Sequence, residues 1–331
     1  MPQAREFHIR PLESAAVRVA LMIEGQEGVT WEQWVALAET CERSGIDTLF
    51  RSDHYLSISS PHERAAHDAW TTIAGLAALT TTLRFGTLVS PVTFRHPSLL
   101  ANAVATADHI SGGRVELGMG AGWMELEHQA FGFPFPPLRE RLEHLAEQLE
   151  IVHRLWTEEH VTFEGTHYRL ADCPALPKPL QDPHPPLLVG GRAKPGTATP
   201  AARFADEYNV IGASFEDYVA ARKALDEACD HERRDPKSLR MSVMTGFLLG
   251  ADEDDLLAKA RASMERWGSP MSPEEALERA RARGTAGTPE QLIEGLSRLE
   301  AIGVERVMLQ HIRHDDLETV ELLGREVVAK L

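Results

Sequence analysis

The stretch Ile110-Ser-Gly-Gly-Arg-Val-Glu-Leu-Gly-Met-Gly-Ala-Gly-Trp-Met-Glu125 joins a strand pattern to a run of closely spaced glycines. From Val115 to Met119 every second residue is apolar, which is the period of a β-strand. Gly118, Gly120 and Gly122 follow, and glycine lets another group approach the main chain closely. A turn of this kind can point backbone N–H groups at an anion. We therefore predict a strand that ends in an anion-binding turn; the alternative is a glycine-rich bend that only ends a buried strand.

Several common motifs are absent or incomplete. The dinucleotide fingerprint G-x-G-x-x-G would need a glycine where Trp123 stands, and the segment 191–197 lacks the lysine of a Walker loop. The segment from His62 to His67 is one residue too long for the zinc motif H-E-x-x-H. The chain has no G-x-S-x-G elbow and no His-x-His pair, and its three cysteines are too scattered for an iron–sulfur site. The sequence therefore predicts neither a Rossmann dinucleotide-binding site nor a metal site.

The amino-acid composition excludes several classes of protein. The 331 residues carry a formal net charge of −16, which argues against binding to nucleic acid or to an anionic membrane surface. An apolar fraction of 43% is ordinary for a globular chain. The cysteines suggest no disulfide framework, and the chain has no apolar signal-peptide core and no run of about 18 apolar residues. We expect a soluble, cytoplasmic protein that acts on a small molecule.

Apolar strand segments alternate with helical patterns along the chain. Strands are expected at 17–23, 46–52, 83–90, 115–119, 187–189, 208–211, 241–249 and 306–311. Helices are expected from Thr30, at 69–80, 97–110, 139–156, 200–205, 215–229, 252–267, 272–283, from Thr288, and at 317–330. This alternation predicts a parallel sheet, and a helix after the eighth strand favours a (β/α)8 TIM barrel over an open doubly wound sheet. We expect a flexible leader at 1–16 and a single barrel domain at 17–331.

Two segments interrupt the alternation. Residues 161–170 alternate in polarity around Glu164-Gly165, which predicts a β-hairpin inserted after the fourth strand. The helix at 272–283 follows the seventh strand, between Gly268 and Gly284, where active-site lids are commonly inserted. We expect 268–287 to form a mobile cover over the barrel mouth; the alternative is an ordered surface helix.

Candidate reactive groups fall after the strands, where α/β barrels carry their active sites. The glycine turns 118–122 and 190–191 could hold a phosphate through backbone N–H groups and a helix N-terminus. Asp53-His54 ends the second strand and supplies a carboxylate and a group that titrates near neutrality. The alternative is that Asp53 caps a turn and His54 is a satisfied histidine. Adjacent strand residues point to opposite faces, so adjacency alone does not make them a catalytic pair.

Five segments occur in this order within residues 17–331: Thr93-Phe-Arg-His-Pro97, the stretch from Ile110 to Trp123, Phe133-Pro-Phe-Pro-Pro137, Val161-Thr-Phe-Glu-Gly165 and Leu188-Val-Gly-Gly191. Together they resemble the bacterial luciferase-like family, and within it the branch that uses the 8-hydroxy-5-deazaflavin coenzyme F420. The resemblance implies a barrel with a flavin or deazaflavin ring in its mouth and the cofactor phosphate on the two glycine turns. It implies a cis peptide bond behind the ring, which we place at Thr87–Leu88. The cofactor-binding residues that it implies are Asp53, Thr87, Leu88, Ser90, Gly120, Ala121, Gly122, Trp123, Val189, Gly190 and Gly191.

Two positions depart from the relatives that oxidise sugar phosphates. Those relatives carry a glutamate proton donor where this chain has Trp123, and a tryptophan where it has Ile58. Sugar-phosphate chemistry is therefore disfavoured, and we expect an apolar wall around the substrate.

We interpret the chain as an F420-dependent oxidoreductase that moves a hydride between the coenzyme and a small organic substrate. His54 is expected to carry the proton, and Asp53 to orient His54 or to bind the ring. An FMN-dependent luciferase-like monooxygenase is the first alternative, and a non-catalytic flavin-binding barrel is the second. The helices at 69–80 and 97–110 are apolar or small nearly all round, which predicts a homodimer unless the leader covers that face.

Overall fold

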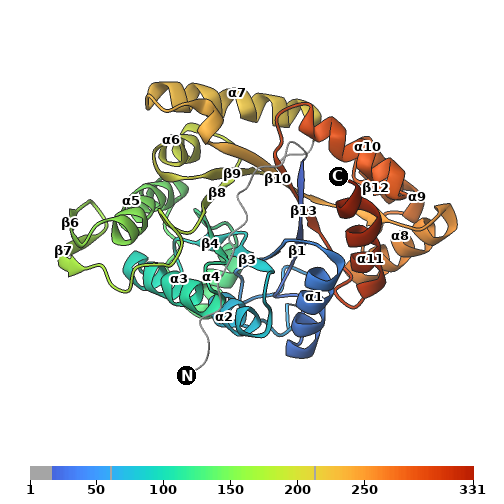
Figure 1. Cartoon of the computed structure of the whole chain (residues 1–331), viewed down its shortest axis with the longest axis horizontal. Coiled ribbons are helices and arrows are strands. Elements are labelled where there is room, and N and C mark those ends of the chain that lie inside the picture. Colours follow the sequence, from blue (N-terminus) through green and yellow to red (C-terminus); the bar gives the residue numbers. More distant parts are fainter. Residues whose placement is uncertain (1–16, 60–61, 212–213) are drawn as a thin grey trace.

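A closed parallel β-barrel surrounded by helices forms the protein (Figure 1). The computed structural model describes residues 17–59, 62–211 and 214–331, so the predicted leader at 1–16 lies outside the described residues. Eight parallel strands pair in the order β3-β2-β1-β13-β10-β9-β8-β5, and β3 pairs with β5 to close the ring. The predicted (β/α)8 TIM barrel is confirmed, and the open-sheet alternative is wrong.

The elements follow the predicted alternation closely. The barrel strands are β1 (Arg18–Ile23), β2 (Thr48–Arg51), β3 (Arg84–Thr87), β5 (Val115–Gly120), β8 (Leu187–Gly191), β9 (Glu207–Val210), β10 (Arg240–Gly246) and β13 (Arg306–Gln310), with a short β4 (Ser90–Pro91) beside β5. The outer helices are α1 (Trp31–Ser44), α2 (Ala69–Leu79), α3 (Pro97–Ser111), α5 (Leu138–Thr157), α6 (Pro195–Phe204), α7 (Phe215–His231), α10 (Pro289–Glu300) and α11 (Leu317–Leu322). A short 3₁₀ helix η1 (Pro236–Ser238) precedes β10, and η2 (Leu323–Val327) and η3 (Val328–Lys330) continue the last helix with π and 3₁₀ geometry.

Two helices differ from the sequence-based expectation. Helix α6 begins at Pro195 rather than near residue 200, because proline fits the first turn of a helix, where its missing N–H costs nothing. Helix α4 (Glu125–Phe131) is not predicted at all, since two turns are too short to show a helical period. None of the described helices is both long and apolar enough to span a bilayer.

Both predicted insertions are present. After β5 the chain forms α4, α5 and the antiparallel hairpin of β6 (His160–Glu164) and β7 (Arg169–Pro174). After β10 it forms β11 (Leu248–Leu249), α8 (Glu253–Trp267), α9 (Pro273–Ala282) and β12 (Ala286–Gly287). Helix α9 lies beside α8 in the outer part of the molecule, and the two share an apolar cluster that includes Leu256, Ala260 and Leu277 (Figure 1). The mobility of 268–287 stays a prediction.

The barrel interior changes in chemistry from one end to the other. At the floor, where the strands begin, Arg306 contacts Glu116 at 2.8 Å and Glu207 at 2.7 Å. Above this layer lies an apolar cluster that consists of Ala20, Met22, Phe50, Leu188 and Met308. Beyond that cluster the strands reach their carboxyl ends, where Gly120 and Gly190 carry no side chains into the barrel. The floor is therefore closed by buried charges, whereas the two glycine-containing strand ends lie at the mouth.

Candidate active site

His54 lies just past the end of β2, at the barrel mouth. Its Nδ1 is 2.7 Å from Oε2 of Glu127, which comes from helix α4. The other oxygen of Glu127 accepts the backbone N–H groups of Tyr55 and, at 3.1 Å, Leu56. The Glu127 side chain is 0% exposed and that of His54 is 11% exposed. A buried carboxylate thus fixes the histidine ring through Nδ1 and leaves Nε2 outside this contact.

Two opposing effects set the pKa of His54. Burial lowers it, because the charged imidazolium loses its hydration. The hydrogen bond and negative charge of Glu127 raise it, with smaller contributions from Glu24 and Asp53, and together these outweigh burial. The pKa of His54 is therefore above its ordinary value of 6.5, which favours the protonated ring relative to a free histidine.

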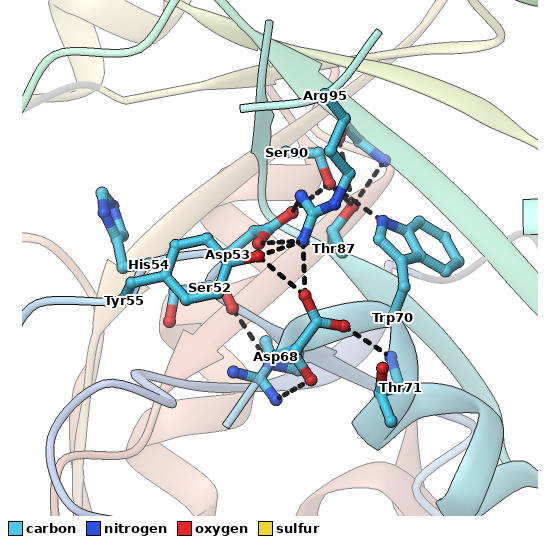
Figure 2. Close-up of polar contacts among 12 residues, drawn as sticks. Ser52, Asp53, His54, Tyr55, Asp68, Trp70, Thr71, Thr87, Ser90 and Arg95 are labelled. Atoms are coloured by element: carbon cyan, nitrogen blue, oxygen red, sulfur yellow. Dashed lines mark hydrogen bonds and ion pairs between the residues drawn. The ribbon is translucent and has the colours of Figure 1, made fainter. Parts of the chain in front are cut away.

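Asp53 belongs to a separate network on the other side of β2, and Figure 2 shows the His54 ring pointing away from it. The Asp53 carboxylate accepts from Ser90 Oγ at 2.6 Å and from Arg95 at 2.5 and 3.1 Å. Arg95 also contacts Asp68 at 2.8 Å. Within the described residues Glu127, and not Asp53, contacts the His54 ring, while the Asp53 carboxylate is engaged by Ser90 and Arg95. Contact between Asp53 and a cofactor ring stays a prediction.

A non-proline cis peptide bond lies between Leu88 and Val89. The sequence-based placement at Thr87–Leu88 is therefore wrong by one bond. The N–H of Leu88 still donates to Arg51 O at 2.8 Å, so the β2–β3 ladder continues through Leu88 and the chain departs from it only afterwards. The Thr87 hydroxyl donates to Gly118 O at 3.1 Å, and the Ser90 hydroxyl donates to Asp53. Both hydroxyl groups are therefore hydrogen-bonded to other parts of the protein.

The first glycine turn is shaped by Val89. A Cβ at Gly120 would lie 2.6 Å from Val89 Cγ2, and one at Gly190 would lie 3.0 Å from Val89 Cγ1. Gly122 has a φ of +77°, which also favours glycine. Within the described chain, the N–H groups of Ala121, Gly122 and Trp123 make no hydrogen bond. Three neighbouring donors without a protein acceptor fit an anionic group such as a phosphate.

The second glycine turn, at residues 190–191, packs against the Tyr208 hydroxyl. The Tyr208 hydroxyl accepts the N–H of Ala193 at 2.8 Å and lies 2.6 Å from Thr197 Oγ1. A Cβ at Gly191 would meet this hydroxyl at 2.6 Å, so glycine is needed for the contact. The Val189 side chain is buried in the core outside the barrel, so only its backbone is available to the mouth. The structure thus brings both predicted turns to the same rim.

The rim combines apolar and polar walls. Trp123 is 61% exposed, and its ring lies nearly perpendicular to that of His54, with 5.8 Å between the ring centroids. Across the mouth, Glu24 follows β1 and accepts hydrogen bonds from Gln26 at 2.9 Å and Gln310 at 2.5 Å. A small cavity adjoins Glu24 and is lined by Glu24, Glu27, Ser59, Arg64, Arg266, His311, Ile312 and His314. The predicted apolar wall is therefore only one side of the mouth.

Glu127 is a candidate site residue that sequence reasoning missed. It stands four residues after Trp123 and two after Glu125, which is exposed. Local sequence cannot separate these two acids, because the difference arises from packing of α4 against the distant loop that carries His54. The partners of Arg95 could not be predicted either. Arg95 lies in the segment Thr93–Pro97, but the acids that it contacts, Asp53 and Asp68, come from other parts of the chain.

Comparisons with known proteins agree with this architecture. The model of the luciferase-like monooxygenase family matches residues 15–306. The chain is 27% identical to an FMNH2-dependent dimethylsulfone monooxygenase of Pseudomonas putida, over 88% of this chain and 85% of the relative. It is 28% identical to an F420-dependent glucose-6-phosphate dehydrogenase of Microbacterium testaceum, over 88% and 90%. A monooxygenase structure from Streptomyces bottropensis superposes with a TM-score of 0.79 at 24% identity, over 95% and 99%.

Fold and site together define a luciferase-like oxidoreductase barrel. The chain belongs to the luciferase-like monooxygenase family. Its curated relatives include both F420-dependent dehydrogenases and FMN-dependent monooxygenases.

Proposed function

We propose that the protein is an F420-dependent oxidoreductase that transfers a hydride between the coenzyme and a small organic substrate. The observation that carries this proposal is the His54–Glu127 pair at the mouth, 2.7 Å apart. Hydride transfer to or from a polar double bond needs a matching proton, and a histidine with a raised pKa can hold or accept it near neutral pH. When bound, the coenzyme supplies the hydride chemistry.

The residues at the mouth fit a phosphorylated, flat cofactor. The free N–H groups of Ala121, Gly122 and Trp123 would hold the phosphate. Val89, seated over Gly120 and Gly190, offers an apolar surface against which a ring can pack. His54 then acts on the open side of the mouth, and Glu127 keeps its ring in one orientation through Nδ1.

The substrate that we propose has an apolar part and a small polar part. Trp123 provides the apolar wall beside His54. The cavity next to Glu24 provides the polar wall, and the hydroxyl of Ser59 there is buried with no partner among the described residues. In the relatives that oxidise sugar phosphates, a glutamate proton donor occupies the position where this chain has Trp123. Sugar phosphates are therefore not the substrates that we propose.

An FMN-dependent monooxygenase is the second candidate, and the sequence identities do not separate it from the first. The identity to the FMNH2-dependent relative, 27%, is almost the same as the 28% to the F420-dependent one. Both cofactors share the phosphate and a flat tricyclic ring, so the glycine turns do not separate them.

Titration of the purified protein with each cofactor tests the proposal. Fluorescence or absorbance should show that F420 binds at least about tenfold more tightly than FMN, a difference of about 1.4 kcal/mol. Riboflavin, which lacks the phosphate, should bind more weakly than FMN if the glycine turn holds that group. Equal affinities, or tighter binding of FMN, would select the monooxygenase instead.

We also propose that two copies associate through the α1–α3 side of the barrel. Four large apolar side chains are exposed on these helices: Trp31 at 37%, Leu79 at 58%, Leu99 at 69% and Ile110 at 46%. Helix α2 packs against both α1 and α3, so the three helices are neighbours on the outside of the barrel. Homodimerisation and a cytoplasmic location stay predictions.

A further inference from the structure

Imidazole and carboxylate groups gather on the insertion after β5, on the outer side of the barrel. Glu140 and His144 occupy adjacent turns of α5, and His167 lies in the turn of the β6–β7 hairpin. One ligand atom from each of these three residues can be chosen so that all lie within 4.8 Å of one another. Figure 1 shows the hairpin at the edge of the molecule beside α5. The cluster shares no residue with those that we assign to the reaction.

The distances approach those of a coordination site. His144 Nε2 is 3.8 Å from Glu140 Oε1, and His167 Nε2 is 3.1 Å from Glu143 Oε2. Tetrahedral Zn²⁺ with bonds of about 2.0–2.2 Å holds its ligand atoms about 3.3 Å apart. Glu140 and Glu143 are 46% and 44% exposed, so their carboxylates can move by the remaining distance. The two imidazole rings stack at 4.1 Å with an interplanar angle of 26°.

The histidines are positioned by neighbours that leave the ligand atoms available. His144 Nδ1 lies 2.8 Å from the Tyr168 hydroxyl, which Gln148 Nε2 holds at 2.6 Å. A histidine ligand usually donates its second N–H to such an acceptor, which fixes the ring and leaves the other nitrogen for the metal. These contacts therefore place the Nε2 atom of His144 on the side of Glu140.

The turn that carries His167 is itself built for this position. Glu147 of α5 accepts the N–H groups of Thr166 at 2.6 Å, His167 at 3.0 Å and Tyr168 at 3.1 Å. A Cβ at Gly165 would collide with the Glu147 carboxylate, so glycine lets the hairpin approach α5 this closely. The hairpin tip is thereby fixed on the helix, and the two histidines keep their spacing.

Electrostatics also suits a cation. The two stacked imidazoles lie beside the carboxylates of Glu140, Glu143 and Glu147, so the cluster offers nitrogen and oxygen ligand atoms and an excess of acidic groups. Arg139 pairs with Glu143, but its side chain is 92% exposed, so this cation screens the cluster only weakly.

We propose that Glu140, His144 and His167 bind a divalent transition-metal ion such as Zn²⁺, with Glu143 as a further ligand or as the partner of His167. Imidazole and carboxylate are ligands that Zn²⁺ accepts. The ion would join α5 to the β6–β7 hairpin and would stabilise the insertion. Local sequence hides the site because its two halves come from different elements, and no short motif spans both.

Titration of the full-length protein with ZnCl2 after treatment with EDTA tests the proposal. Calorimetry should show one equivalent per chain with a Kd on the order of micromolar or below. His144→Asn and His167→Asn should each weaken binding by about a hundredfold or abolish it. Tyr168→Phe should weaken binding by about tenfold, as expected for a residue that positions a ligand. His160→Asn is the matched control, because His160 lies on the same hairpin and contacts Asp172 instead.

Thermal unfolding gives an independent measurement. Zn²⁺ should raise the Tm of the wild type and of His160→Asn, EDTA should reverse the effect, and the His144 and His167 variants should not respond. Glu140→Gln, at an exposed position, serves where a histidine variant fails to fold, and it should weaken Zn²⁺ binding at least tenfold. The proposal is overturned if the wild type binds no equivalent in this range. It is also overturned if binding survives unchanged in the His144, His167 and Glu140 variants.

Discussion

Carboxylate side chains are buried at both ends of the barrel, but their ion-pair partners differ between the floor and the mouth. At the floor, Glu116 and Glu207 face Arg306, and every member of this group is 3% exposed or less. At the mouth, Glu127 is buried just as completely and faces His54. Arginine keeps its charge throughout the physiological range, whereas histidine changes its charge near neutral pH. The first arrangement therefore fixes structure, and only the second can move a proton.

The pKa shifts of the two sites follow the same distinction. Burial alone would raise the pKa of Glu116, but the charges of Arg306 and Arg84 outweigh it and hold the pKa below its ordinary value. At the mouth the histidine is the group whose pKa rises. Buried charge is thus not by itself a sign of function; what matters is whether the partner titrates in the working range.

Removing the histidine at the mouth should have the largest effect. His54→Ala should lower turnover by about 10²–10⁴, the usual share of general acid–base catalysis, or roughly 3–5 kcal/mol. Cofactor affinity should change much less, because we assign the phosphate to the glycine turn. Steady-state kinetics and cofactor titration measure the two effects separately. His67→Ala, at an exposed histidine of the same loop, is the control.

The opposite pattern would show that His54 only packs against the cofactor. In that case His54→Ala would weaken cofactor binding while turnover at saturation stayed near the wild-type value, with water as the proton source.

Breaking the floor should destabilise the fold by about 3–5 kcal/mol. Arg306→Met leaves Glu116 and Glu207 buried without their shared cation, whereas Arg43→Met removes an exposed pair with Glu321 and should cost less than about 1 kcal/mol. Urea unfolding of both variants measures the difference. The cost of Arg306→Met should shrink on acidification, because protonated carboxyls no longer need the cation. Equal losses in the two variants would contradict the assigned role of the floor.

The fold could be predicted from the sequence because its signals are local. Each barrel strand is a short apolar run, and helix starts such as Thr30, Ser272 and Thr288 carry capping boxes that the structure forms. These patterns need only a few neighbouring residues. The order of eight strands then leaves little choice of topology.

The site was harder to predict because its contacts are long-range. Asp53 and His54 are adjacent in sequence, yet their partners Arg95 and Glu127 lie 42 and 73 residues away. No local pattern indicates which of several acids will reach His54. The predicted positions of the two glycine turns are correct, since a turn at a strand end is a local feature, whereas the pairing of the acid with the base is not.

The smallest effect, and the sharpest test of the comparison, should come from Glu127→Gln. The amide is nearly isosteric, so its oxygen can still accept the N–H groups of Tyr55 and Leu56. Its NH2 group would then face Nδ1 of His54, where an acceptor for the protonated ring stands in the wild type. The pKa of His54 should fall, because burial, which lowers it, is no longer outweighed by the charge of Glu127. NMR titration of the His54 ring measures this directly.

Turnover of Glu127→Gln should drop by about tenfold, roughly 1.4 kcal/mol, and the limb of its pH profile that reports His54 should move to lower pH. Glu125→Gln, at an exposed acid of the same helix, should change neither measurement. If activity falls while the pKa of His54 stays in place, Glu127 acts through the geometry of the loop alone, and the mouth resembles the floor more closely than we propose.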